Sequence, residues 1–349
     1  AWKSQFFSGL MQPLTNFVGN IGYVGVCLLG GFLASGNAIS IGDIQAFIQY
    51  VRQFNQPITQ LAQIMNQLQS TAAAAERVFE FLDESELEEE TPRITHEQLA
   101  KIDGSVTFNH VNFGYNPDKT IINDFSMHVH AGQTVAIVGP TGAGKTTIVK
   151  LLMRFYELNS GNILIDGHDI KDYARSDLRS LFGMVLQDTW LFGGTIRENL
   201  KYGKLDATDE EMEKACQLAY ADHFINTLED GYDTVINEES NNISQGQKQL
   251  LTIARAFLAD PKILILDEAT SSVDTRTEVL IQKGMDKLME GRTSFIIAHR
   301  LSTIRDANTI IVMRDGDIVE LGNHESLLAK GGFYADLYQS QFESSKEDE

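Results

Sequence analysis

The chain of 349 residues is long enough for two domains with at least one full hydrophobic core, and its apolar fraction of 43 % is typical of a globular protein. Its formal net charge of −20 argues against nucleic acid as the main partner, because phosphate contacts need clustered Lys and Arg. The two cysteines, Cys27 and Cys216, offer neither a disulfide framework nor metal-ligand spacing, which suits a reducing cytosol.

Residues 1–82 differ in charge from the rest of the chain. They contain three basic and three acidic side chains, so the whole acidic excess lies in 83–349. This pattern is typical of an apolar leader followed by a water-exposed acidic domain. The first residue is Ala and a helical pattern begins at once, so we expect a fragment of a longer protein. The charged segment and cleavage site typical of a signal peptide are not visible.

The stretch from Ser4 to Gly42 contains no charged residue. Its segment 16–39 exceeds the about 20 residues that a helix needs to cross a bilayer of roughly 30 Å. Small residues within it favour a membrane helix that packs against neighbours or a polar pathway, because they allow close helix contact. A buried core helix of a soluble protein is the alternative.

A second helix is predicted after Asp43, because apolar residues recur at alternating steps of four and three, a period of 3.5. They are Phe47, Val51, Phe54, Ile58, Leu61, Met65, Leu68, Ala72, Ala75, Phe79 and Leu82. The intervening face is rich in Gln and Asn, which suits a membrane helix that continues into water, or a soluble coiled coil. We predict a membrane part over 1–82 and an acidic linker over 83–103, of which the run 83–93 ends the helix and is expected to be solvated.

A phosphate-binding loop is predicted at 139–147, GPTGAGKTT. The strand 134–138 leads into it and an apolar helical run follows, which is the context that G-x-x-x-x-G-K-T requires. Its glycines let backbone N–H groups point at phosphate oxygens, Lys145 neutralises the outer phosphates, and the Thr146 hydroxyl suits a Mg²⁺ ligand. An ordinary Gly-rich turn is the alternative. The predicted contacts are Gly139, Pro140, Thr141, Gly142, Ala143, Gly144, Lys145, Thr146 and Thr147.

Two later apolar runs, 262–270 and 293–300, are predicted to contain buried parallel strands. The first ends in Asp267 and Glu268: one carboxylate can hold Mg²⁺ through water, and the adjacent one can deprotonate the attacking water. The second run ends in His299. Because the carboxyl ends of parallel strands meet at one sheet edge, we expect these side chains at the phosphate site, with His299 on the outer phosphate.

These elements together resemble the ABC transporter superfamily, in particular the exporter type, in which membrane helices are fused to an ATPase domain. The matching motifs are Walker A (139–147), the Q-loop (185–188), Walker B with its catalytic Glu (263–268), the D-loop (271–274) and the H-loop (His299). Tyr115, 24 residues before Gly139, matches the aromatic residue that stacks on adenine. The segment NISQGQ (242–247) lies where the family has its signature, L-S-G-G-Q.

The resemblance implies an α-helical transmembrane segment, the last two helices of a truncated exporter core, followed by an α/β P-loop ABC ATPase domain over 104–349 with a helical subdomain at about 188–258. It implies ATP and Mg²⁺ as cofactors, and export of an amphiphilic drug, lipid or peptide across the cell membrane, with a cytoplasmic ATPase domain. The implied catalytic residues are Glu268, His299, Gln187 and Lys145, and the implied metal ligands are Thr146, Gln187 and Asp267.

In this family the signature of one subunit covers the nucleotide held by the other, so Ser244, Gly246 and Gln247 are predicted to contact the partner's nucleotide. Gln245 replaces the first Gly of the signature, and its bulk is expected to weaken closure over that phosphate. Because the Walker side is complete, we favour a heterodimer of multidrug type with a second half-transporter over a homodimer. A soluble ABC-type ATPase of chromosome organisation or DNA repair is the alternative function.

Overall fold

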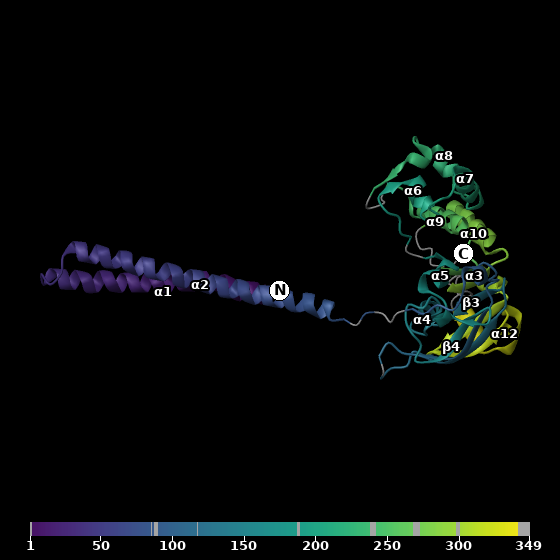
Figure 1. Cartoon of the computed structure of the whole chain (residues 1–349), viewed down its shortest axis with the longest axis horizontal. Helices are drawn as coiled ribbons and strands as arrows, with labels where there is room; N and C mark the ends of the chain where they lie inside the picture. Colours follow the sequence, from purple (N-terminus) through teal and green to yellow (C-terminus); the bar gives the residue numbers. More distant parts are fainter. Residues whose placement is uncertain are drawn as a thin grey trace. The chain divides into compact units, whose positions relative to one another are not determined.

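The structure is a computed structural model, and it describes residues 2–84, 86, 90–116, 118–186, 189–237, 242–267, 273–297 and 301–340. The chain divides into two compact units, Ala1–Glu88 and Glu89–Glu349 (Figure 1). Each unit has its own packing and is described by itself.

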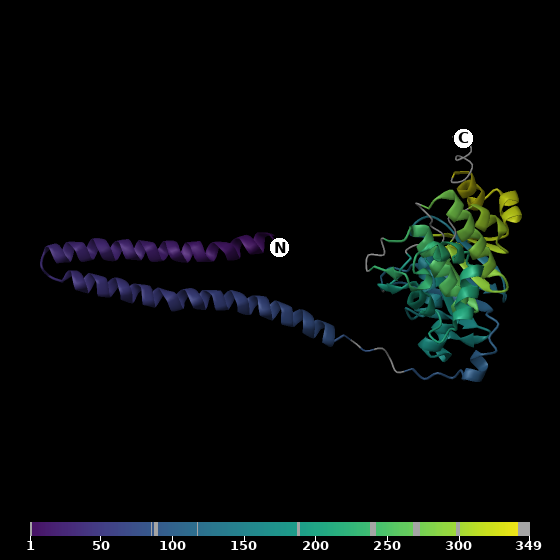
Figure 2. The same ribbon diagram turned by 90° about the horizontal axis from the view of Figure 1, so that it is seen from above.

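The first unit is a hairpin of two long helices, α1 (Trp2–Ser35) and α2 (Ile41–Leu82), which lie side by side (Figure 2). They run antiparallel, since Gly30 packs on Ile44 close to the turn and Gly19 packs on Asn55 farther from it. A capping box starts α2: the Ser40 hydroxyl accepts from the Asp43 N–H at 3.3 Å, and the Asp43 carboxylate accepts from the Ser40 N–H at 2.9 Å. The predicted second helix is therefore present.

Within the described residues, Asn16–Ser35 of α1 is the one stretch that is long and apolar enough to cross a membrane. The more polar α2 does not meet that criterion, although its predicted apolar seam is largely uncovered: Phe54 is 71 % and Leu61 is 58 % exposed. The hairpin thus leaves large apolar side chains uncovered along both helices, as is expected of helices that meet lipid or further helices.

The predicted linker is not solvated along its whole length. The Glu90 carboxylate lies 2.7 Å from an Arg175 guanidinium nitrogen, and the Ile94 N–H donates to the Asp172 carbonyl at 3.1 Å. A short helix, α3 (His96–Leu99), precedes Ile102, which is buried in the core of the second unit. The second half of 83–103 is therefore fixed to the second unit, which its acidic composition does not reveal.

Two sheets build the second unit. The first is antiparallel, in the order β2 (Ile122–Val129), β1 (Val106–Phe113), β4 (Ser160–Ile165) and β5 (His168–Asp169). The second has the order β12 (Asp317–Gly322), β11 (Thr309–Arg314), β3 (Thr134–Val138), β10 (Thr293–Ile297), β9 (Ile263–Asp267) and β6 (Phe182–Val185). Its neighbours pair in parallel except for the β11–β12 pair, which is antiparallel.

The register of the second sheet brings three strand ends together. Ile297 of β10 lies opposite Ile137 of β3 on one side and opposite Asp267 of β9 on the other. The side chains of β9 are buried at the first four positions because the sheet is covered on both faces. The prediction that the strands ending near 138, 267 and 298 meet at one edge is confirmed.

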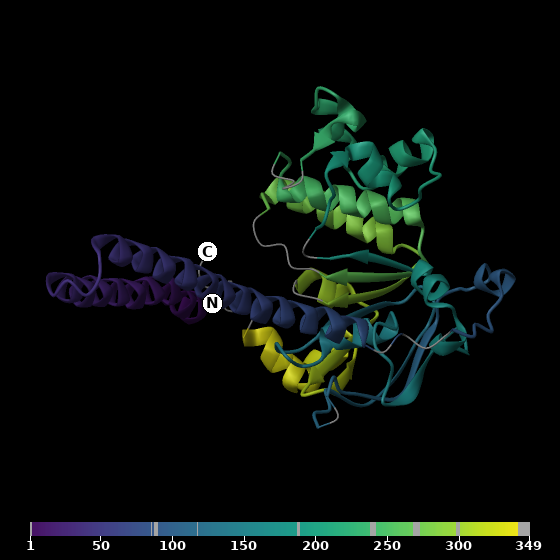
Figure 3. The same cartoon turned by 60° about the vertical axis from the view of Figure 1, so that its left-hand side comes forward.

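Two hydrophobic cores cover the two faces of this sheet. One core lies toward the antiparallel sheet and α4 (Lys145–Leu152), where Phe108 packs edge-to-face on Phe125, with ring centres 5.1 Å apart. The other core packs helices of the second unit against the strands of this sheet (Figure 3). The helices of this core include α6 (Ile196–Lys201), α7 (Asp209–Leu218), α8 (Asp222–Thr227), α9 (Gln245–Ala259) and α10 (Thr275–Met289).

Smaller elements complete the second unit. They are α5 (Arg175–Ser180), α11 (Leu301–Asp306), α12 (His324–Lys330), α13 (Phe333–Tyr338), the 3-10 turns Ile170–Asp172 and Gly231–Asp233, and the ribbon of β7 (Gly194–Thr195) and β8 (Val235–Ile236).

Candidate nucleotide-binding site

Two glycines of the loop between β3 and α4, Gly139 and Gly144, stand close against neighbouring strands. A Cβ on Gly139, whose φ is +151°, would stand 2.2 Å from the Met313 carbonyl oxygen of β11. A Cβ on Gly144, whose φ is +100°, would stand 2.7 Å from Ile122. The loop therefore packs tightly against neighbouring strands on one side, while α4 begins at Gly144 with backbone N–H groups that have no partner within the helix. Such a turn suits an anion.

Lys145 is folded back over this loop. Its ammonium group donates to the carbonyl oxygens of Gly139 at 2.7 Å and Pro140 at 3.1 Å. Desolvation by burial lowers the pKa of Lys145, and the negative charge of Asp267 opposes that shift. A partly desolvated cation placed at the loop is ready to gain anionic oxygens in place of the carbonyl groups.

A hollow of about 690 Å³ joins the loop to the end of β9. It is lined by Lys119, Thr120, Ile121, Thr141, Gly142, Ala143, Gly144, Lys145, Thr146, Thr147, Asp267, Ile297 and Asp315. The structure thus brings together the seven predicted loop contacts from Thr141 to Thr147 and the predicted metal ligand Asp267. The other predicted residues of this edge, Gln187, Glu268 and His299, lie outside the described residues.

Tyr115 lies beside the same loop. Its hydroxyl is 3.4 Å from the Thr147 hydroxyl, and the Lys150 ammonium is 5.9 Å from its ring centre. The ring packs edge-to-face against Tyr156, with ring centres 5.0 Å apart, yet remains 42 % exposed. An aromatic surface next to the first turn of α4 suits a nucleobase whose phosphates lie on the loop. Sequence reasoning missed Tyr156, because its contact with Tyr115 depends on the path of the chain between α4 and β4.

The predicted signature forms the start of α9. Ser244 is the cap residue: its hydroxyl accepts from the Gln247 N–H at 3.2 Å, and the Gln247 side-chain oxygen accepts from the Ser244 N–H at 2.8 Å. Gly246 has a packing role, since a Cβ there would stand 2.4 Å from a Thr277 methyl group of α10. The helix start is therefore fixed by its own residues and by α10 before any partner binds.

Gln245 makes a contact that the sequence did not predict. Its side-chain amide donates to the Thr189 hydroxyl at 3.0 Å. Thr189 follows the predicted Q-loop residue Gln187 by two positions, so the side chain that replaces the first signature Gly is tied to the neighbouring loop segment. This bond gives Gln245 a role within its own subunit, in addition to the expected effect of its bulk.

The family described as ABC transporter matches residues 122–271, which contain β3, the glycine loop, α9 and β9. The chain is 58 % identical over 331 residues to the "Fatty acid ABC transporter ATP-binding/permease protein" of Mycobacterium tuberculosis, a match that covers 95 % of this chain and 52 % of that protein. The chain belongs to the ABC transporter superfamily.

Further relatives agree with this assignment. The "Uncharacterized ABC transporter ATP-binding protein YfiC" of Bacillus subtilis is 51 % identical over 97 % of this chain and 56 % of that protein. The solved structure of a bacterial Atm1-family ABC exporter with ATP bound superposes with a TM-score of 0.69 at 36 % identity, covering 98 % of this chain and 59 % of that one. This chain spans about half the length of the curated relatives it matches.

Two conclusions follow for this ABC chain. Its second unit contains an ABC ATPase domain with a P-loop, an α/β sheet and a helical part, as predicted. Its matches extend over both helices of the first unit and carry the names of transporters, so they favour an exporter-type half-transporter over the soluble alternative of chromosome organisation or DNA repair.

Proposed function

We propose that this chain couples ATP hydrolysis to the export of an amphiphilic, lipid-like molecule across the cell membrane, as one half of a two-chain transporter. The observation that carries the proposal is the single hollow that unites the glycine loop, Lys145 and Asp267, in a chain whose other unit is an apolar hairpin. The fatty acid transporter at 58 % identity supports a lipid among the drug, lipid and peptide substrates expected.

The residues present fit Mg²⁺. The Thr146 hydroxyl and the Asp267 carboxylate both line the hollow, and hard oxygen ligands of this kind are what the ion prefers. With Gln187 they would hold the ion, which when bound supplies charge neutralisation between the phosphates.

The remaining steps fall to side chains of this chain. The loop N–H groups and Lys145 bind the phosphates, and Tyr115 supports the base. Glu268 takes a proton from the attacking water, while Lys145 and His299 stabilise the charge on the transferred phosphoryl group. Ser244, Gly246 and Gln247 cover the nucleotide of the opposite subunit, and closure moves the membrane helices between two accessible states.

Transport by the complete protein in sealed vesicles tests the proposal. With the ATPase domains facing outward, external ATP is expected to drive a fluorescent fatty acid into the lumen, since the cytoplasmic side then faces the medium. Accumulation should require both ATP and Mg²⁺, and vesicles without the protein are the control. An active ATPase that remains in the soluble fraction of the cell and moves no amphiphile would contradict the assignment.

Substitution of Gln245 distinguishes a heterodimer from a homodimer. In the favoured heterodimer, this chain's signature completes the partner's site and not the site that contains Glu268. Gln245→Gly is then expected to keep steady-state turnover within about twofold. It should lower the ATP concentration that half-fills the partner's site about fivefold. The reason is that the bulky Gln245 side chain no longer hinders closure of the two subunits over the nucleotide. Turnover and photolabelling of each subunit with an azido-ATP measure the two effects.

The matched control is Thr189→Val, which removes the acceptor of the Gln245 amide but keeps the bulk of Gln245. It is expected to leave the affinity of the partner's site unchanged. A rise in turnover by about fivefold in Gln245→Gly would instead place this signature over the active site, as in a homodimer.

A further inference from the structure

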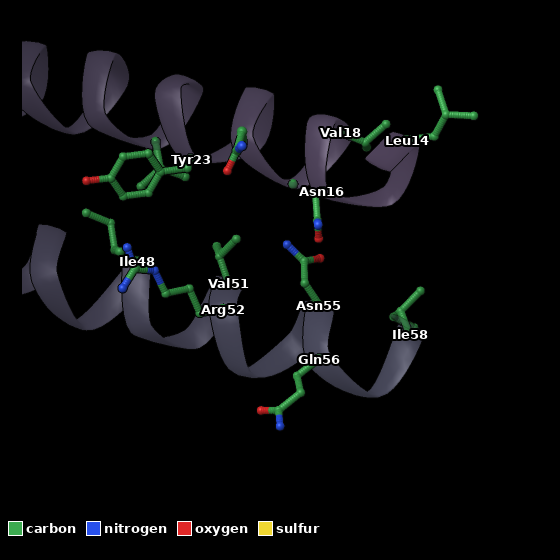
Figure 4. A pocket seen from close by; sticks show the side chains of 13 residues that line it. Leu14, Asn16, Val18, Tyr23, Ile48, Val51, Arg52, Asn55, Gln56 and Ile58 are labelled. Carbon is green, nitrogen blue, oxygen red and sulfur yellow. The ribbon is translucent and has the colours of Figure 1, made fainter. Parts of the chain in front are cut away.

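The first unit contains a second hollow, which the ATPase mechanism does not use. A cavity of about 840 Å³ lies between α1 and α2. Polar side chains enter it from both helices: Asn16 and Asn55 face each other across the gap, and Arg52 lies next to Tyr23 (Figure 4). Gly19 lies beside Asn55, since a Cβ there would stand 3.5 Å from the Asn55 amide nitrogen, an ordinary contact distance. Polar side chains that lie beside the membrane-length stretch of α1 are candidates for a functional role.

The position of Arg52 in the hairpin makes its positive charge energetically unfavourable in a membrane. Arg52 is nine residues from Asp43 at the start of α2, which corresponds to about 14 Å along a helix. Its guanidinium carbon is 5.5 Å from the ring centre of Tyr23, which lies inside the membrane-length stretch Asn16–Ser35. If this stretch crosses the bilayer, Arg52 lies within the hydrocarbon layer, where an unneutralised charge is strongly unfavourable.

The hairpin itself stabilises the charge of Arg52 only in part. The face of Tyr23 gives a cation–π contact, and amide groups line the cavity. Among the described residues, Arg52 forms no ion pair with a carboxylate. The acidic residues of α2, Asp43, Glu76 and Glu80, are at least nine positions away along the helix. The cavity therefore presents a cation with room for an anion beside it.

We propose that this cavity binds the anionic head group of the transported amphiphile, with Arg52 as the charged contact. A guanidinium group donates two parallel hydrogen bonds to a carboxylate or phosphate, which fits an acid better than a neutral head group. The amides of Asn16 and Asn55 supply further polar contacts, and Leu14 and Ile58 at the rim offer apolar surface for an acyl chain. The inference rests on the proposed export of an amphiphile and narrows its class to anionic ones.

The test uses the complete transporter in nanodiscs of phosphatidylcholine. Laurate and dodecanol share a chain length and differ in charge, so half-saturating concentrations for stimulation of ATP hydrolysis are compared between them. Arg52→Gln is expected to raise the value for laurate about tenfold or more, and to leave the value for dodecanol within about twofold. Arg52→Lys should recover most of the loss for laurate, because it keeps the charge.

Arg77→Gln is the matched control, since it removes an exposed arginine of the same helix at a distance from the cavity. It is expected to behave as the wild type with both ligands. A second set of nanodiscs containing phosphatidylglycerol identifies the source of the anion. Weaker laurate stimulation there, in the wild type but not in Arg52→Gln, would show that a membrane lipid head group also occupies the site.

Two results would overturn the inference. Laurate half-saturation in Arg52→Gln within about twofold of the wild type would show that no anion depends on this charge, as when a carboxylate of another helix neutralises Arg52. Equal losses for laurate and dodecanol, with no recovery in Arg52→Lys, would show that Arg52 only supports the hairpin. Failure of the proposed function is distinguishable, because the wild-type transporter would then show no ATP-driven transport at all.

Discussion

Lys145→Ala is expected to reduce ATP affinity about 100-fold and to leave hydrolysis at background, because charge-assisted hydrogen bonds to the phosphates are lost. The ammonium group of Lys145 is partly buried, and the carbonyl groups of Gly139 and Pro140 hold it at the loop. Binding of a fluorescent ATP analogue and release of phosphate measure the two effects.

The same substitution is not expected to destabilise the fold. The pKa of Lys145 is lowered by desolvation, so its charged form is disfavoured in the folded state, and this penalty is fully present at pH values below the folded pKa. Removal of the charge should keep or slightly raise the melting temperature. Lys214→Ala on the exposed face of α7 is the control and should bind ATP as the wild type does. Wild-type affinity in Lys145→Ala would contradict a phosphate role for the loop.

Glu268→Gln is expected to keep ATP binding and to lower turnover at least about 100-fold, since a general base contributes that much or more. Glu268 lies outside the described residues. Its neighbour Asp267 ends β9 in the hollow that contains the glycine loop, where we propose that the phosphates bind. The variant should accumulate in an ATP-bound closed state. Single-turnover phosphate release and retention of labelled ATP measure these effects.

Glu213→Gln, an exposed change of the same kind on α7, is the control for Glu268→Gln. It should hydrolyse ATP at the wild-type rate. Undiminished hydrolysis in Glu268→Gln by the complete transporter would remove Glu268 from the assigned role and leave the general base to another group.

Local signals in the sequence predicted the core of the ATPase unit well. The strand predicted at 134–138 is β3, and the runs predicted at 262–270 and 293–300 contain β9 and β10. These segments are short apolar runs bounded by glycine or polar residues, and both faces of their sheet are covered, so local pattern and tertiary environment agree. The glycine loop was predictable for the same reason, since its backbone conformation requires glycine at defined places.

Contacts between distant segments were not predictable in this way. Tyr156 supports Tyr115, and Thr189 accepts a hydrogen bond from Gln245, but neither pair shares a local pattern. The fixed half of the linker was also missed: Glu90 and its acidic neighbours suggest solvent, yet Arg175 lies opposite Glu90 only because of how α5 is placed. Periodicity indicates that a face is apolar, and it does not indicate which element covers it.

The close packing of Gly246 against Thr277 has a consequence for how the two nucleotide sites of a dimer are coupled. Because a Cβ on Gly246 would stand 2.4 Å from a Thr277 methyl group, the start of α10 cannot move toward the start of α9 without displacing it. In the proposed two-chain transporter, the start of α9 covers the nucleotide site of the partner subunit. A change in the nucleotide site of this chain would then be transmitted to the nucleotide site of its partner, so the two sites would not act independently.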